Sequence, residues 1–407
     1  ILMSFSYKEL YLNNRKVGEY YSMLVGMTFG MFLLASAVNL ITIYLSIEIL
    51  SFSSYVLAGY TKEIKRASEA SLKYVIYGSL SSGIMVYGMS LLYGSTMTLD
   101  VAKINQVILT GNVELFPLII GGLMILVGFG YKISAVPFHY WTPDVYEGAP
   151  ITITSFLSVA SKAAGFAVFI RFFKDLYFAP ASSSIDVWST ISNFNWHTIL
   201  AILAVLTMTV GNFVALWQEN VKRLLAYSSI AHAGYLLLGV VVMTNAGVTS
   251  VLMYFVFYMI MNLGAFFVAQ LFENEIGSDN INNYNGLGYR SPVLAVLMTI
   301  FLISLTGLPP TAGYIGKFYI FAAVLEKGMI WLAVIAILNS VVSLFYYAKI
   351  IRNMFLRQSN DVNNSSKFSA KAFPISIAYV LAVFTILFGV YFSPILDWAK
   401  SSVSMFK

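Results

Sequence analysis

The sequence predicts an all-α protein that crosses a membrane many times, and three observations lead to this fold class. Of the 407 residues, 59% are hydrophobic and only 10% are charged, whereas a soluble protein of this size needs more charge to cover its surface. Apolar runs of about 20 residues recur along the chain, and this is the length that a helix needs to span a bilayer core. Two of the runs exceed about 30 residues and contain prolines, which is typical of helices that are broken inside a membrane.

About eleven spans are expected. In chain order they are 19–38, 39–60, 68–94, 115–147, 150–173, 198–217, 224–243, 248–272, 291–325, 329–356 and 372–394.

The first five spans follow from continuous apolar runs with one interruption. The fourth, 115–147, contains VPFHYWTP. At a rise of about 1.5 Å per residue it is too long for one straight crossing of a core about 30 Å thick. Proline removes a backbone donor and clashes with the preceding turn, so we expect this helix to break there. The fifth span starts at Pro150.

The next five spans repeat this order. Three continuous runs are followed by 291–325, which contains GLPPTAGYIG and is expected to break, and then by 329–356. We therefore expect two inverted repeats of five helices, 19–174 and 198–357, each with a broken fourth helix. A last span at 372–394 completes a single membrane bundle over 1–407.

The loop charges predict the orientation. When the spans alternate in direction, most loop lysines and arginines fall on the side of Lys65, Arg66, Lys222 and Arg223, which the positive-inside rule makes cytoplasmic. The net charge of +6 follows from this asymmetry and does not indicate nucleic-acid binding. The chain starts at Ile1 without a methionine, so we expect that N-terminal spans are missing.

Ionisable residues inside the spans are the candidate functional groups, because each costs about 2.5–3.5 kcal/mol to insert. One glutamate, Glu48, accompanies four deep lysines, so one carboxylate cannot pair with all of them. Burial disfavours the charged form of a lysine and a nearby carboxylate favours it, so such lysines can exchange protons. The candidates are Glu48, Lys73, Lys132, Lys162, Lys317, His139 and His232.

Structural interpretations compete with this one. Lys73 and Lys349 can extend their ammonium groups to the membrane surface, and His232 can be a neutral, hydrogen-bonded core histidine. A pair of Glu48 with one lysine can be purely structural. Other chemistry is excluded more firmly, because the chain has no cysteine and its three histidines lack metal-ligand spacing.

The stretch GFGYKISAVPFHYWTPDVYEGAPITITSFLSVASKAAGF resembles the signature of the antiporter-like subunit N (subunit 2) family of respiratory complex I, the proton-pumping NADH:quinone oxidoreductase. LSIEILSFSSYVLAGY, EASLKYVIYG, VKRLLAYSSIAHAGYLLLG and SLTGLPPTAGYIGKFYIF extend the resemblance over nearly the whole chain. Members of the family have fourteen spans, so the resemblance implies that the first three are absent here. The form ASKAAGF, with its lysine, resembles subunit N more than subunits L and M.

The resemblance implies roles for the candidate residues. Glu48 resembles the essential carboxylate, which pairs with the lysine that Lys73 matches. Lys132 resembles the central lysine beside the first break, Lys162 a bridging lysine, and Lys317 the lysine of the second broken helix. His139 and His232 match positions with softer roles. In the implied mechanism, protons load Lys132 or Lys162, and a change in the Glu48–Lys73 distance drives a proton from Lys132 toward Lys317.

The resemblance also implies partners and cofactors. We expect no cofactor in this chain, and FMN, iron–sulfur clusters and quinone in partner subunits. The expected partners are antiporter-like subunit M, small membrane subunits of complex I and membrane lipid, in a bacterial inner membrane or, alternatively, an organelle energy-transducing membrane. The chain would then be an enzyme only as a subunit of the oxidoreductase. Two other classes stay open: a subunit of a Mrp-type cation/proton antiporter complex, and a structural module that does not pump.

Overall fold

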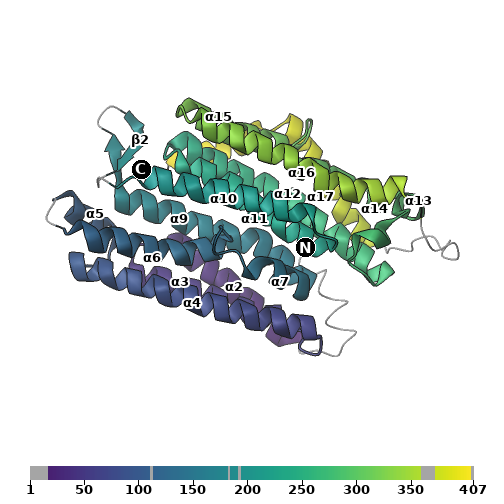
Figure 1. Ribbon diagram of the computed structural model, residues 1–407, viewed down its shortest axis with the longest axis horizontal. Coiled ribbons are helices and arrows are strands. Elements are labelled where there is room, and N and C mark those ends of the chain that lie inside the picture. The colour runs from purple at the N-terminus through teal and green to yellow at the C-terminus, as the bar shows by residue number, and fades with distance from the viewer. Residues whose placement is uncertain (1–16, 111–112, 182–183, 191–193, 359–371, 405–407) are drawn as a thin grey trace. The chain divides into compact units, whose positions relative to one another are not determined.

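The computed structural model describes residues 17–110, 113–181, 184–190, 194–358 and 372–404 (Figure 1). The chain divides into two compact units. Unit 1 comprises 1–203 and 243–245, and unit 2 comprises 204–242 and 246–407. The described elements are almost all helices, as the sequence predicts.

Unit 1 contains helices that match the first five predicted spans, together with short elements that the sequence did not predict. Its elements are α2 (Val17–Ser36), α3 (Leu40–Ala58), α4 (Lys65–Thr96), α5 (Val101–Leu109), α6 (Leu115–Ile133), α7 (Trp141–Gly148), α8 (Ile151–Phe156), η1 (Leu157–Ser161), α9 (Lys162–Tyr177), β1 (Phe178–Ala181), β2 (Ser184–Thr190) and the start of α10 (Trp196–Leu216).

The core of unit 1 is built on α4 and α6, which lie side by side. A Cβ atom added at Gly88 on α4 would lie 2.6 Å from the Gly121 carbonyl oxygen on α6. Only glycine permits this approach of two backbones, and small residues are typical of such contacts between membrane helices. The contact fixes α6, and with it the residues at the end of α6, against α4.

Unit 2 holds the remaining predicted spans. Its elements are the rest of α10, α11 (Val221–Val241), α12 (Asn245–Ile276), η2 (Ile281–Tyr284), α13 (Leu287–Arg290), α14 (Pro292–Thr306), α15 (Ala312–Glu326), α16 (Ile330–Leu356), α17 (Ala372–Val390) and α18 (Ser393–Ser404).

Both predicted breaks are present. The run 115–147 divides into α6 and α7, and the run 291–325 divides into α14 and α15. The intervening residues include Pro137 and the pair Pro309-Pro310, and each break contains a cis prolyl peptide bond. Ser134 caps α6 with a φ of +64°, and Gly307 caps α14 with a φ of +87°. Both helices therefore end in the left-handed turn that commonly terminates a helix.

One local structure occurs in both units. In unit 1, Asn39 begins α3 and forms an isolated antiparallel bridge with Asp100, just after α4. In unit 2, Asn220 begins α11 and forms the same bridge with Asn280, after α12. The bridged segment follows a helix of 32 residues in each case. The two units thus share a detail beyond the order of their spans.

The last predicted span differs in its end. The predicted span 372–394 corresponds to α17, and a further helix, α18, follows it with a bend of 79°. Ala399 of α18 packs in a cluster with Met253 and Phe257 of α12, and Ile395 and Leu396 lie against the same cluster. Apolar residues at 395, 396 and 399 have helical spacing, so the sequence pattern indicates this short amphipathic helix, which was not among the predicted spans.

The membrane assignment rests on helix length and composition. Among the described residues, nine helices are long and apolar enough to cross a membrane, α14 is shorter, and α17–α18 form one bent pair. The exact number of crossings and the inversion of the repeats stay predictions.

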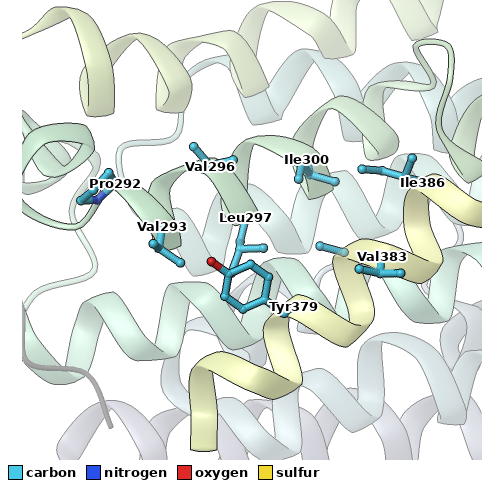
Figure 2. Close-up of a pocket in the computed structure, with 9 residues that line it drawn as sticks. Pro292, Val293, Val296, Leu297, Ile300, Tyr379, Val383 and Ile386 are labelled. Carbon is cyan, nitrogen blue, oxygen red and sulfur yellow. The ribbon is translucent and has the colours of Figure 1, made fainter. Parts of the chain in front are cut away.

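A surface groove of about 380 Å³ lies between α14 and α17 (Figure 2). Its lining is apolar except for the hydroxyl group of Tyr379, and includes Val293, Leu297 and Val383. Without charged or amide groups this groove offers no chemistry for a polar substrate.

Candidate functional site

Lys132 lies at the end of α6, immediately before the first break. Its side chain is 1% exposed, and its Nζ donates a hydrogen bond to Ser51 Oγ of α3 at 3.0 Å. The unsatisfied carbonyl groups at the C-terminus of a helix favour a nearby cation. The break therefore supplies Lys132 with a polar environment that does not depend on an ion pair.

Glu48 lies on α3, three residues before Ser51. Its Oε1 is buried and has no hydrogen-bond partner in the described part of the chain. The Glu48 carboxylate nevertheless acts electrostatically on Lys132. A buried charge without hydrogen bonds is costly unless an opposite charge is near. Lys132 lies close enough to be affected by Glu48 but forms no direct ion pair with it among the described residues.

The expected pairing of Glu48 with Lys73 is wrong in this structure. The Nζ of Lys73 lies 2.7 Å from Asp144 Oδ2 of α7 and 2.7 Å from Glu69 Oε1 of α4. The side chain of Lys73 is 38% exposed, so it is also less deep than predicted. Glu48 is therefore not the only carboxylate near the four lysines, because the broken helix carries Asp144 back to α4.

Asp144 belongs to this site although the sequence did not indicate it, because its side chain joins α7 to α4. Gly148, at the end of α7, also lies against α4: a Cβ atom there would be 2.5 Å from the Arg66 carbonyl oxygen. Because α7 follows the break directly, its attachment also restrains the break and the nearby Lys132.

We expect Asp144→Asn to weaken this attachment more than Glu69→Gln does. The reason is burial: the Asp144 side chain is 26% exposed and that of Glu69 is 63% exposed, and exposed pairs contribute about 0–1 kcal/mol. Asp144→Asn should lower the thermal stability of the purified protein and its transport activity, whereas the control Glu69→Gln should leave both near wild type. Equal effects of the two variants would contradict the special position of Asp144.

His139 lies inside the first break, between α6 and α7, and is 6% exposed. Its Nδ1 has no hydrogen-bond partner among the described residues. The break itself is held by Trp141, whose Nε1 donates to the Tyr131 carbonyl oxygen at 3.0 Å and whose ring stacks on Tyr74 at 4.4 Å. These contacts hold the break, and with it His139, in a fixed position. His139 is close to Lys132 in the sequence, and its function stays a prediction.

Lys162 follows a π-helical turn directly. The turn is η1, Leu157–Ser161, and Lys162 is the first residue of α9. π-Helical turns inside α-helices are rare and frequently occur at functional sites. Lys162 is 1% exposed, and its Nζ lies 5.9 Å from the centroid of the Tyr146 ring. The ammonium group thus lies within the range of a cation–π interaction with the residue two positions after Asp144.

Gly165 brings the helices of Lys132 and Lys162 together. A Cβ atom at Gly165 would lie 3.4 Å from Lys132 Cγ and 3.0 Å from Ile133 Cγ2. Gly165 is one turn after Lys162, so α9 contacts α6 at the level of both lysines. The structure therefore brings Glu48, Lys132 and Lys162 into one region of unit 1, and places Lys73 in a separate ion-pair cluster.

His232 lies on α11 in unit 2 and is 1% exposed. Its Nδ1 is 2.6 Å from the Tyr254 hydroxyl of α12, and its Nε2 is 3.4 Å from the Tyr347 hydroxyl of α16. Tyr347 also forms a hydrogen bond with Ser228. Both ring nitrogens therefore face hydroxyl groups that can donate or accept a proton.

Lys317 lies on α15, just after the second break, and is 3% exposed. Its Nζ donates to the Thr306 carbonyl oxygen at 2.8 Å and to Ser340 Oγ at 3.3 Å, and lies 4.5 Å from the centroid of the Tyr235 ring. Thr306 is the last residue of α14, so this lysine also faces the C-terminus of a broken helix. A groove of about 310 Å³ adjoins Lys317.

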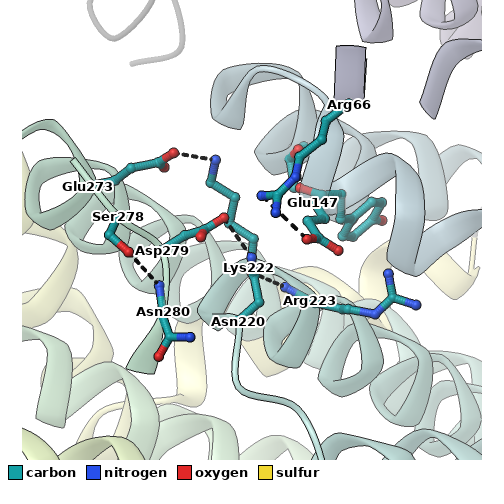
Figure 3. A network of polar contacts seen from close by, with 11 residues as sticks. Arg66, Glu147, Asn220, Lys222, Arg223, Glu273, Ser278, Asp279 and Asn280 are labelled. Atoms are coloured by element: carbon teal, nitrogen blue, oxygen red, sulfur yellow. Dashed lines mark hydrogen bonds and ion pairs between the residues drawn. The ribbon is translucent and has the colours of Figure 1, made fainter. Parts of the chain in front are cut away.

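Other ionic groups in both units serve helix ends (Figure 3). In unit 1, Arg66 lies 3.6 Å from Glu147. In unit 2, Lys222 Nζ lies 2.7 Å from Glu273 Oε1, and Asn220 Nδ2 donates to Asp279 Oδ2 at 2.6 Å. These pairs join loops and helix ends, and we assign them a structural function.

The donor set does not fit a bound metal. In the ranges that the structure describes, no group of three or more histidine, aspartate and glutamate side chains is arranged to hold an ion, and the sequence has no cysteine. What the site offers is a set of buried lysine and histidine side chains.

Comparisons with known proteins identify a family. Residues 37–343 match the family described as NADH:quinone oxidoreductase/Mrp antiporter, transmembrane. The chain is 51% identical to NADH-quinone oxidoreductase subunit N 2 of Chloroherpeton thalassium, over 100% of this chain and 78% of that protein.

Solved structures give the same family. Respiratory complex I from Thermus thermophilus contains a chain with a TM-score of 0.76 and 31% identity, covering 93% of this chain and 79% of that one. A chain of the Mrp complex from Dietzia sp. matches with a TM-score of 0.79 at 19% identity, covering 94% and 77%. At that identity the second match concerns the fold alone.

Proposed function

This chain belongs to the NADH:quinone oxidoreductase/Mrp antiporter transmembrane family, and on that premise we propose that it translocates protons as a subunit N of a bacterial NADH:quinone oxidoreductase. It is a multi-pass protein of the bacterial inner membrane, and its relatives are subunits of an oxidoreductase complex. Its expected neighbours are the other antiporter-like subunits and small membrane subunits.

One observation carries this proposal: each broken helix has a buried lysine at the break. Lys132 precedes the first break and Lys317 follows the second, and neither forms an ion pair within the described residues. Both instead donate to oxygen atoms of hydroxyl or carbonyl groups. A purely structural lysine would normally be paired or exposed, whereas a lysine in this environment can exchange its proton.

We assign the other residues by their positions. Glu48 sets the electrostatic environment of Lys132, since its carboxylate is the charge that acts on it. Lys162 receives a proton next, because Gly165 brings its helix against Lys132. His232 and its tyrosine partners belong to the path toward Lys317, the exit lysine, and His139 supports the first break. The two units would be inverted repeats, in keeping with the bridge at Asn39 and at Asn220.

The driving energy comes from partner subunits in this proposal. Electrons would pass from NADH through FMN and iron–sulfur clusters to quinone in those subunits. This chain itself offers no cysteine to ligate a cluster, so its contribution is proton binding and transfer. Redox chemistry would reach it as a change in charge or conformation near Glu48.

We expect Lys317→Met to lower NADH-driven proton uptake about tenfold, the effect of about 1.4 kcal/mol on a rate. The reason is that methionine fills the space of the lysine without binding a proton. Uptake should be measured in inverted membrane vesicles, with the amount of assembled complex as the reference.

The matched control is Lys349→Met. Lys349 lies on α16 and donates to the Gln218 carbonyl oxygen, so it is a lysine that the proposal leaves out. Wild-type uptake in Lys317→Met, or an equal loss in Lys349→Met, would contradict the assignment. A requirement for sodium in place of NADH would favour the cation/proton antiporter alternative.

A further inference from the structure

A series of polar and aromatic side chains in close contact lies between His232 and Lys317 in unit 2, and its middle is a pair of amides. Asn212 of α10 and Asn339 of α16 are 0% and 5% exposed. On one side, Tyr347 contacts His232, and its ring lies 4.4 Å from that of Tyr346. On the other side, the Tyr235 ring lies 4.5 Å from Lys317 Nζ, which donates to Ser340.

The amide orientations follow from a backbone group. Asn339 Nδ2 lies 3.0 Å from the Ile335 carbonyl oxygen, which can only accept, so this atom must be the NH₂ group. Asn339 Oδ1 therefore faces Asn212 and accepts from its Nδ2 at 3.2 Å.

The orientation of Asn339 in turn fixes that of Asn212. Its Nδ2 uses one hydrogen toward Asn339 and the other toward the Tyr235 hydroxyl at 3.2 Å. Its Oδ1 accepts from the Tyr346 hydroxyl at 3.0 Å. Each hydrogen-bond donor and acceptor of the Asn212 side chain that faces these tyrosines thus has a partner. In each of these hydrogen bonds the donor and the acceptor are fixed.

Hydrogen bonds connect the two sides through this pair of amides, but the pair cannot pass a proton from one side to the other. To pass a proton from Tyr346 to Tyr235, Asn212 would have to gain a proton on Oδ1 and lose one from Nδ2. That exchange produces the unfavourable imidic acid form of the amide. A carboxyl group in the same place would make the exchange between two equivalent oxygen atoms and return to its starting form.

We propose that the Asn212–Asn339 amide pair is an insulating gate between His232 and Lys317, which blocks direct proton transfer until water or a side-chain movement bypasses Asn212. This inference rests on the proposed function and deepens it. The transfer that the gate controls is balanced: a protonated His232 loses a proton and a neutral Lys317 gains it. Asn212 and Asn339 are positioning residues in this step, because neither keeps a proton.

The decisive variant is Asn212→Asp, which keeps the shape of the side chain and introduces a group that relays protons. We expect the number of protons taken up per NADH oxidised to fall by about half, with turnover retained, because a carboxyl relays protons at all times. The established proton gradient should also decay faster in these vesicles. Asn212→Leu cannot relay a proton and should not increase the decay rate.

The matched control is Asn353→Asp. Asn353 is a buried amide on the same helix as Asn339, and it donates to the Ile281 carbonyl oxygen away from this path. If Asn212 had only a structural role, Asn212→Asp and Asn353→Asp would take up the same number of protons per NADH oxidised. If Asn212→Asp fails to assemble, Asn212→Ser decides the same question, because a hydroxyl group in place of the amide can both accept and donate a proton.

The outcomes separate the two proposals. An unchanged ratio and decay rate in assembled Asn212→Asp, with a pumping wild type that Lys317→Met impairs, overturns the gate and leaves the proposed function intact. A wild type that takes up no protons with NADH overturns the proposed function, and the gate with it. A lower ratio in Asn212→Asp alone supports the gate.

Discussion

Glu48→Gln is expected to abolish NADH-driven proton uptake while the complex still assembles. Glu48 Oε1 is buried without a hydrogen-bond partner among the described residues, so an amide there loses little packing or bonding. The substitution removes the negative charge of the side chain. Lys132 loses the carboxylate that acts on it and keeps only its hydrogen bond to Ser51.

The expected size of the effect follows from Coulomb's law. Two unit charges about 4 Å apart at an effective dielectric constant of about 20 interact by about 4 kcal/mol, and at about twice that distance they still interact by about 2 kcal/mol. That corresponds to a change of about thirtyfold in a proton-binding equilibrium. The interaction is therefore large enough to decide whether Lys132 holds its proton.

The control for this variant is Glu69→Gln. Glu69 is also a carboxylate next to an intramembrane lysine, but it is largely exposed and Lys73 keeps its second partner, Asp144. Uptake should be near wild type in Glu69→Gln. Normal pumping by an assembled Glu48→Gln protein would show that the charge of Glu48 is not needed.

The sequence predicted the features that depend on local chemistry. Proline in a long apolar run predicts a break, and both breaks are where VPFHYWTP and GLPPTAGYIG lie. A lysine in the middle of such a run must be buried or paired, and Lys132, Lys162 and Lys317 are buried. These predictions need only the cost of placing polar groups in a membrane.

The sequence could not predict features that depend on how helices meet. Asp144 pairs with a lysine 71 positions earlier because α7 turns back toward α4, and no spacing rule reveals this. The π-helical turn before Lys162 has no residue signature in LSVAS. The Asn212–Asn339 pair consists of neutral residues, which a search for charges passes over.

The measurement that tests this account most directly compares wild type with Lys162→Met in inverted membrane vesicles. Proton uptake and NADH:quinone turnover are followed together, and assembly is checked on the same membranes. Methionine has the length and apolar volume of the lysine stem, so it keeps the packing after the π-helical turn and removes only the group that binds a proton.

Lys162 is central because α9 lies against α6 at Lys132 and because its ammonium group is buried beside Tyr146. We expect assembled Lys162→Met vesicles to lose NADH-driven proton uptake by about tenfold or more. Wild-type uptake and turnover in the assembled variant would contradict it, and would make Lys162 a structural residue.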